Sequence, residues 1–213
     1  MASTSTPSAT VRSTVTTAAT RTPDRLSARD RLLTAADELF YDEGVHTVGI
    51  DRIIERAGVA KASLYNTFGS KDELIRAYLE GRYRARQERV TGFIARYDTP
   101  RERLLGVFDA LGSVAAEPGF RGCAFMNASA ESLPGGPVEE VSDESRAWTR
   151  RLFTELAAAA GVADPAGLAE QFVLLYDGAT VGARMDRTAA TGVAARAIAE
   201  TLLDAAPKAS SHP

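Results

Sequence analysis

The chain has 213 residues, of which 45% are hydrophobic and 25% are charged, and its formal net charge is −3. This length and composition suffice to bury a substantial core in one or two domains. A single cysteine, Cys123, and two histidines exclude an internal disulfide and a Cys/His zinc site, so we expect neither a metal nor a cofactor.

The N-terminal segment, residues 1–24, is rich in Ser, Thr and Ala and contains Arg12 and Arg21. Such a segment cannot bury enough apolar surface to order itself, which favours a disordered tail over a basic arm that touches DNA. It also lacks the apolar centre of a signal peptide, and the chain has no run of about 18 apolar residues. We therefore expect a cytoplasmic protein without a membrane span.

Three short helices are expected over residues 25–70. Ser27 and Asp30 have the spacing of a helix-capping pair, and Gly44 is placed to end this first helix. Apolar residues at helical spacing then flank Gly58, which can supply the left-handed backbone of a tight turn. This pattern is typical of a helix-turn-helix, whose second helix, about residues 61–67, can enter the major groove of DNA. An ordinary helical hairpin fits the same spacing.

The segment AGVAKASLYNTFGSKDEL, residues 57–74, resembles the DNA-binding signature of the tetracycline-repressor (TetR) family. The resemblance covers about residues 26–80 and implies an N-terminal three-helix DNA-binding domain at residues 25–70. It also implies a larger helical domain at residues 71–206 for ligand binding and dimerisation. The matching positions are Ala57, Gly58, Val59, Leu64, Tyr65, Phe68, Lys71 and Leu74.

Few side chains of the third helix can reach base edges, because this helix is short. Lys61 is the strongest candidate, since a lysine can bind the O6 and N7 atoms of guanine. Tyr65 and Lys71 match family positions that grip phosphate, and the amides that begin the next helix attract anions. The full set of DNA-binding candidates is Thr47, Lys61, Ala62, Ser63, Tyr65, Asn66, Ser70 and Lys71.

Charge is distributed unevenly along the chain. Residues 25–89 hold 12 basic and 11 acidic side chains, whereas residues 90–213 hold 11 basic and 16 acidic ones. The front third is therefore better suited than the remainder to approach the phosphates of double-stranded DNA.

A long fourth helix is expected from Ser70 to about Arg96. Ser70 is a favoured capping residue, and acidic side chains follow it in the first turn, where the helix dipole favours them. Arg82, Arg86 and Arg89 lie near one face of this helix. Oppositely charged neighbours at helical spacing favour a solvated face over a DNA contact for this arginine row.

Proline and glycine breaks divide the rest of the chain into further helices, and no segment has a convincing strand pattern. We therefore expect an all-α fold of about nine helices. The C-terminal residues, 207–213, are expected to fray. The remaining helices are expected at about residues 100–116, 123–132, 138–160, 165–184 and 189–205.

Cys123, Asn127 and Glu131 are four residues apart and share one helix face. Such a polar stripe either lines a ligand cavity or forms a hydrogen-bond network that ties helices together. Aromatic residues on several other helices suggest a mostly apolar cavity with a few polar groups, the usual form of a small-molecule site. The ligand-binding candidates are Phe108, Cys123, Phe125, Met126, Asn127, Glu131, Trp148, Phe172 and Tyr176.

Small residues in the last two predicted helices allow close packing of helix backbones. Gly178 and Gly182 are four apart, and residues 193–206 are rich in Ala. These helices either pack within one chain or form the interface of a homodimer. The resemblance favours a homodimer through about residues 165–206.

Two classes of function compete for this sequence. The resemblance implies a ligand-responsive transcriptional regulator, a repressor that binds a palindromic operator as a dimer and is released by a small apolar or amphipathic effector. The alternative is an all-helical small-molecule-binding protein or enzyme without DNA binding. An enzyme needs a converging acid/base or metal set. The sequence offers no catalytic residues of that kind.

Overall fold

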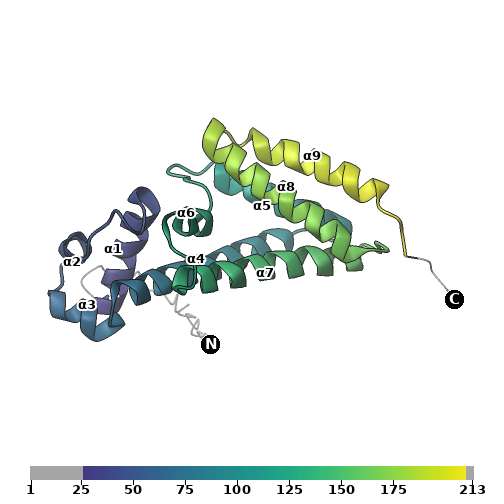
Figure 1. The fold of residues 1–213 in the computed structure, drawn as a ribbon. Coiled ribbons are helices and arrows are strands. Elements are labelled where there is room, and N and C mark those ends of the chain that lie inside the picture. The colour runs from purple at the N-terminus through teal and green to yellow at the C-terminus, as the bar shows by residue number, and fades with distance from the viewer. Residues whose placement is uncertain (1–25, 210–213) are drawn as a thin grey trace, which may run out of the picture.

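The computed structural model describes residues 26–209, in which the chain forms nine α-helices and no strand (Figure 1). This confirms the expected all-α fold. Within the same residues, no helix combines the length and apolar composition needed to cross a bilayer. The expected tail at residues 1–24 lies outside the described part. The helices are α1 (Ala28–Glu43), α2 (Ile50–Ala57), α3 (Lys61–Phe68), α4 (Lys71–Ile94), α5 (Pro100–Ala115), α6 (Ala124–Glu131), α7 (Pro137–Ala159), α8 (Pro165–Asp186) and α9 (Ala190–Ala205).

Local capping groups set where the helices begin. The hydroxyl of Ser27 accepts a hydrogen bond from the Asp30 amide, and that of Ser70 accepts one from the Glu73 amide, each at 3.1 Å. Thr99 caps α5 in the same way. These bonds satisfy amides that have no partner within the helix. The helix ends differ from the expected ones by up to two residues; α4, for example, ends at Ile94.

The first hydrophobic core joins α1–α3 to the beginning of α4, to α6 and to the start of α7. We call α1–α3 the head and α5–α9 the body. The expected domain boundary at residue 70 remains a prediction, although apolar packing continues across it into α4. The core includes Leu32, Phe40, Ile53, Leu64, Leu74, Tyr78, Phe125 and Val138.

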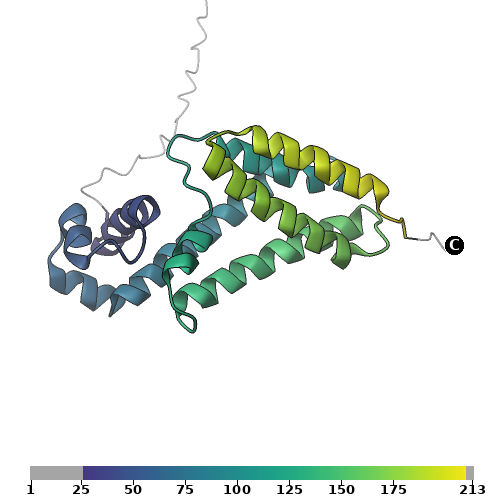
Figure 2. The ribbon, with the colours of Figure 1, turned by 45° about the horizontal axis from the view of Figure 1, so that its top comes forward.

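The second hydrophobic core fills the body. Phe108, Phe153 and Phe172 are completely buried, and their ring centroids lie 5.5–5.7 Å apart. The end of α4 adds Val90 and Ile94 to this core. Helix α4 therefore runs from the head into the body, with α7 beside it (Figure 2). Helices α8 and α9 pack together away from the head.

The C-terminal end of the described chain is anchored to the α7–α8 turn. The Ala163 amide donates to the Pro207 carbonyl at 2.8 Å, and the Ala209 amide donates to the Gly161 carbonyl at 2.9 Å. These bonds flank an isolated antiparallel bridge between Val162 and Lys208. Residues 207–209 are thus paired, which corrects the expected frayed tail at its beginning. Residues 210–213 lie outside the described part.

The close approach of α5 and α9 provides a test of this packing. A Cβ atom added at Gly192 would lie 2.6 Å from the Cα atom of Gly112, and this backbone cannot move aside cheaply. We expect Gly192→Ala to lower the free energy of unfolding by about 1–3 kcal/mol through overpacking, as measured by urea denaturation.

The exposed helical residue Gly92 is the matched control, because a Cβ atom added there meets nothing within 4 Å. Gly92→Ala should leave stability unchanged or raise it by up to about 1 kcal/mol, since alanine favours helix. Equal effects of the two substitutions would show that α5 and α9 do not pack as described.

Candidate functional site

The turn between α2 and α3 has the geometry of a helix-turn-helix. Gly58 adopts the left-handed conformation, with φ 62° and ψ 42°, and ends α2. Arg31 of α1 donates from Nη1 to the Gly58 carbonyl at 3.2 Å and so holds the turn against α1. Leu64 is completely buried, which fixes the side of α3 that faces the head core. The opposite side of α3 is free to meet a groove of DNA.

Most of the DNA-binding candidates lie on α3 or where α4 begins. Lys61, Ala62, Tyr65 and Asn66 are exposed, and Ser63 is half-buried. Thr47 is exposed in the connection between α1 and α2. The half-buried residues Ser70 and Lys71 stand where α4 begins. This surface presents side chains of the types that contact bases and phosphates.

Intramolecular partners already occupy several polar groups of this surface. The ammonium group of Lys61 lies 2.9 Å from Asp51 Oδ1, and this hydrogen bond raises the pKa of Lys61. Partial burial lowers the pKa of Lys71, whose ammonium group lies 5.9 Å from the centroid of the Phe40 ring. Lys61 and Asp51 are both exposed to solvent, so their ion pair is weak. DNA can therefore displace Asp51 from Lys61 at little cost in free energy.

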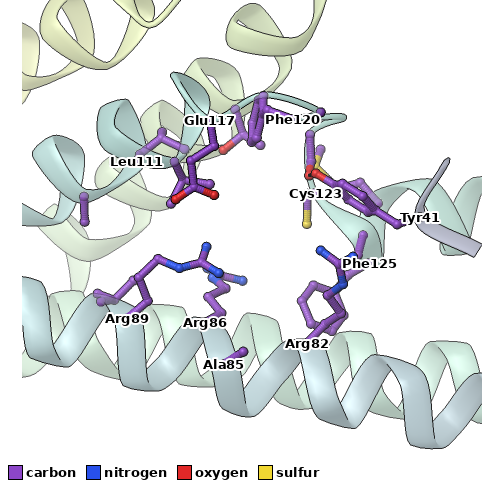
Figure 3. A pocket seen from close by; sticks show the side chains of 18 of the residues that line it. Tyr41, Arg82, Ala85, Arg86, Arg89, Leu111, Glu117, Phe120, Cys123 and Phe125 are labelled. Atoms are coloured by element: carbon purple, nitrogen blue, oxygen red, sulfur yellow. Dashed lines mark hydrogen bonds between the residues drawn. The ribbon is translucent and has the colours of Figure 1, made fainter. Parts of the chain in front are cut away.

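A cavity of about 440 Å³ lies where the head meets the body (Figure 3). Its walls come from α1, α4, α5, α6 and α8 and from the connection between α5 and α6. Leu111, Val114, Phe120 and Phe125 provide apolar surface. The volume is within the usual range for small-molecule sites.

The arginine row of α4 lines this cavity: Arg82 and Arg86 are half-buried, which corrects the expectation of a solvated face for these two, whereas Arg89 is exposed as expected. Arg82 donates from Nε and Nη2 to both carboxylate oxygens of Asp37, at 2.5 and 2.8 Å. The Arg86 and Arg89 guanidinium groups point into the cavity (Figure 3). All three arginines thus form a cationic wall of the cavity, and Arg89 remains open to water.

The cavity includes some ligand-binding candidates and excludes others. Its lining contains Cys123, Phe125, Met126 and Tyr176. The other candidates do not line the cavity, which corrects the prediction. Phe108 and Phe172 are completely buried in the body core. Trp148 packs against Tyr83 and Arg86 outside the lining. Asn127 and Glu131 also lie outside it.

Asn127 and Glu131 instead make contacts between elements. Asn127 binds the Arg121 carbonyl through Nδ2 at 3.1 Å, and its Oδ1 accepts a hydrogen bond from Arg184 of α8. Glu131 Oε2 accepts from the His46 amide of the head at 3.0 Å. These contacts favour the hydrogen-bond network that the polar stripe left open as an alternative.

Sequence reasoning missed the role of Tyr41 in α1. Its hydroxyl donates to the Gly122 carbonyl at 3.0 Å and accepts from the Arg121 amide at 2.9 Å, so the head is joined to the segment before α6. Tyr41 also lines the cavity, and its ring lies under the Arg82 guanidinium at 4.0 Å from ring centroid to Cζ. No sequence motif marks this contact, since its partners are backbone groups about 80 residues away.

The helix-turn-helix of this chain is similar in sequence to those of known transcriptional regulators. Residues 32–78 match the family of bacterial regulatory proteins described as the tetR family. The transcriptional regulator AcuR of Cereibacter sphaeroides is 30% identical over 189 residues, which cover 77% of this chain and 80% of AcuR. The transcriptional activator FasR of Mycolicibacterium smegmatis is 52% identical over 52 residues, but these span only 24% of each chain.

Solved structures extend the similarity over nearly the whole chain. A TetR-family transcriptional regulator from Streptomyces coelicolor is 36% identical, with a TM-score of 0.78 over 83% of this chain and 94% of that one. A putative regulator of the same kind from Streptomyces avermitilis is also 36% identical, with a TM-score of 0.72 over 86% and 100%. Its fold, its helix-turn-helix and these relatives place the chain in the TetR family of DNA-binding transcriptional regulators.

Proposed function

We infer that the chain acts as a dimeric repressor that binds a near-palindromic operator and is released when a small amphipathic effector enters the cavity. The observation that carries this inference is the position of the cavity. Its wall includes Asp37 and Tyr41 of the head as well as residues of α4, α5 and α8. An effector that binds there touches the head directly, so its binding can favour one head position over another.

The proposed dimer interface rests on an apolar stripe that the single chain leaves uncovered. Leu174, Val181 and Met185 of α8 are 69%, 45% and 73% exposed, although all three are large apolar side chains. They share one helix face with Gly178, around which a Cβ atom would meet nothing within 4 Å. Contiguous exposed apolar surface of this kind marks protein interfaces. In contrast, Gly182 faces Thr191 of α9 within the chain.

A dimer would hold two copies of α3 at a fixed separation. Two recognition helices related by two-fold symmetry read two half-sites about one helical turn of DNA apart, or a multiple of that distance. Lys61 is proposed to contact bases, and Tyr65, Ser70, Lys71 and Thr47 to contact phosphates. An operator obtained by selecting a randomised duplex pool on the protein should therefore be a near-palindrome.

Substitution of the two lysines separates base reading from phosphate binding. Lys61→Ala should weaken the selected operator about tenfold or more and relax preference at one base pair of each half-site. Lys71→Ala should weaken all sequences alike and reduce the slope of log affinity against log salt by about one. Titrations against operator and scrambled duplex over a salt series measure both effects. Indistinguishable effects of the two variants on specificity would refute the assigned roles.

A charged side chain on the α8 stripe tests the dimer. Gly178→Glu should give monomers in sedimentation experiments at micromolar concentration, because a carboxylate would be buried at the interface without a partner. These monomers should lose operator binding. Gly92→Glu is the control, since it places the same side chain on an exposed helical glycine of α4. A Gly178→Glu protein that remains dimeric would place the interface elsewhere.

The contact of Tyr41 with residues 121–122 is the proposed link between head and body. Tyr41→Phe removes a hydroxyl that both donates and accepts, and should lower the free energy of unfolding by about 1 kcal/mol in urea denaturation. Tyr65→Phe is the control, because the Tyr65 side chain is 44% exposed on α3. If both variants unfold like the unmodified chain, the Tyr41 contact does not stabilise the protein.

A further inference from the structure

The cationic side chains of the cavity have unequal partners. Arg82 is neutralised by the bidentate pair with Asp37. Arg86 instead donates to two neutral hydroxyls, Ser145 Oγ at 3.0 Å and Thr149 Oγ1 at 2.7 Å. Arg89 makes no ion pair and no side-chain hydrogen bond with the part of the chain that the structure describes. Two guanidinium groups thus reach the cavity without a carboxylate partner.

Arg86 is held in place by its surroundings. Its guanidinium carbon lies 5.6 Å from the centroid of the Trp148 ring and 5.4 Å from that of the Tyr176 ring. A guanidinium has five N–H donors, and the two hydroxyls use only part of them. The remaining donors of a fixed, half-buried cation are suited to bind a carboxylate, because a rigid fork loses little entropy on binding.

Most acidic residues of the lining are already paired. Besides Asp37, Asp177 binds Arg146 at 2.7 Å, and Glu38 binds Arg56 at 2.7 Å. The remaining acids, Asp42 and Glu117, are exposed. Glu117 lies across the cavity from Arg86 and Arg89, on the connection between α5 and α6 (Figure 3). Because Glu117 is exposed, its side chain can rotate toward the solvent when another anion binds near Arg86 and Arg89.

We propose that the cavity binds an organic carboxylate with an apolar tail. The carboxylate lies between the guanidinium groups of Arg86 and Arg89, and the tail lies against Leu111, Phe120 and Phe125. This assignment rests on the proposed function, in which the cavity is the effector site, and it names the chemical class of the effector. A charge-assisted contact with arginine gives selectivity for an anion over a neutral or cationic molecule of the same shape.

Three probes of equal chain length test the assignment: octanoate, 1-octanol and octylamine. The chain contains one tryptophan, Trp148, and its ring is adjacent to Arg86, so its fluorescence reports binding at this position. Octanoate should bind at least about tenfold more tightly than either of the other probes. Equal or tighter binding of 1-octanol or octylamine, or no saturable signal with octanoate, would overturn the proposal.

Substitutions identify the groups that hold the carboxylate. Arg89→Gln should weaken octanoate about tenfold or more and leave 1-octanol unchanged. Arg84→Gln is the matched control, because Arg84 is on the same helix and is exposed like Arg89, but it lies outside the cavity lining. Glu117→Gln should tighten octanoate, since it removes a competing anion. An unchanged octanoate affinity in Arg89→Gln would overturn the proposal.

Arg86→Lys provides a second variant that keeps the charge. It should also weaken octanoate, because an ammonium group cannot replace the planar fork that binds both hydroxyls and ligand. Its unfolding temperature shows whether the protein remains folded.

Operator binding by the ligand-free protein is measured separately and tests the proposed function alone. If the protein selects an operator but binds octylamine more tightly than octanoate, only the proposal of a carboxylate effector is refuted. If the protein binds octanoate through Arg89 but selects no DNA sequence, only the proposed binding of an operator is refuted.

Discussion

Helix α4 supplies buried side chains to both hydrophobic cores of the described chain, as does α7, which packs beside it. Its first half packs Leu74 and Tyr78 into the core shared with the head, and its second half packs Val90 and Ile94 into the body core. Because α4 is continuous from Lys71 to Ile94, the head cannot move against the body without bending this helix or repacking a core. The cavity lies beside the middle of α4, where a bound ligand can favour one position of the head relative to the body.

Arginines in the middle of α4 line the cavity between the head and the body. Guanidinium groups must keep hydrogen-bond partners when they are taken from water. Arg82 finds Asp37 of the head, and Arg86 finds Ser145 and Thr149 of α7. Arg82 therefore holds the head to α4 and Arg86 holds α7 to α4, so a ligand that binds Arg86 also acts on the contact between α4 and α7.

Local signals predicted the helices well, because capping and turn formation involve neighbouring residues. Ser27 and Ser70 begin helices as expected, and Gly58 forms the expected turn. Which aromatic side chains line the cavity depends on how the helices meet, and the sequence does not show this. Phe108, a predicted cavity residue, is therefore found in the core. The inward direction of Arg82 does have a sequence signal: it follows Tyr78, a buried residue, by four positions on the same helix face.

The most direct test of the account is the reciprocity between the cavity and the DNA-binding surface. If octanoate in the cavity weakens operator binding by a given factor, the bound operator must weaken octanoate binding by the same factor. Both factors can be measured, the first by operator titration at saturating octanoate and the second by Trp148 fluorescence in the presence of saturating operator. We predict equal factors, each well above one. An octanoate affinity that is the same with and without bound operator would show that the cavity does not control DNA binding.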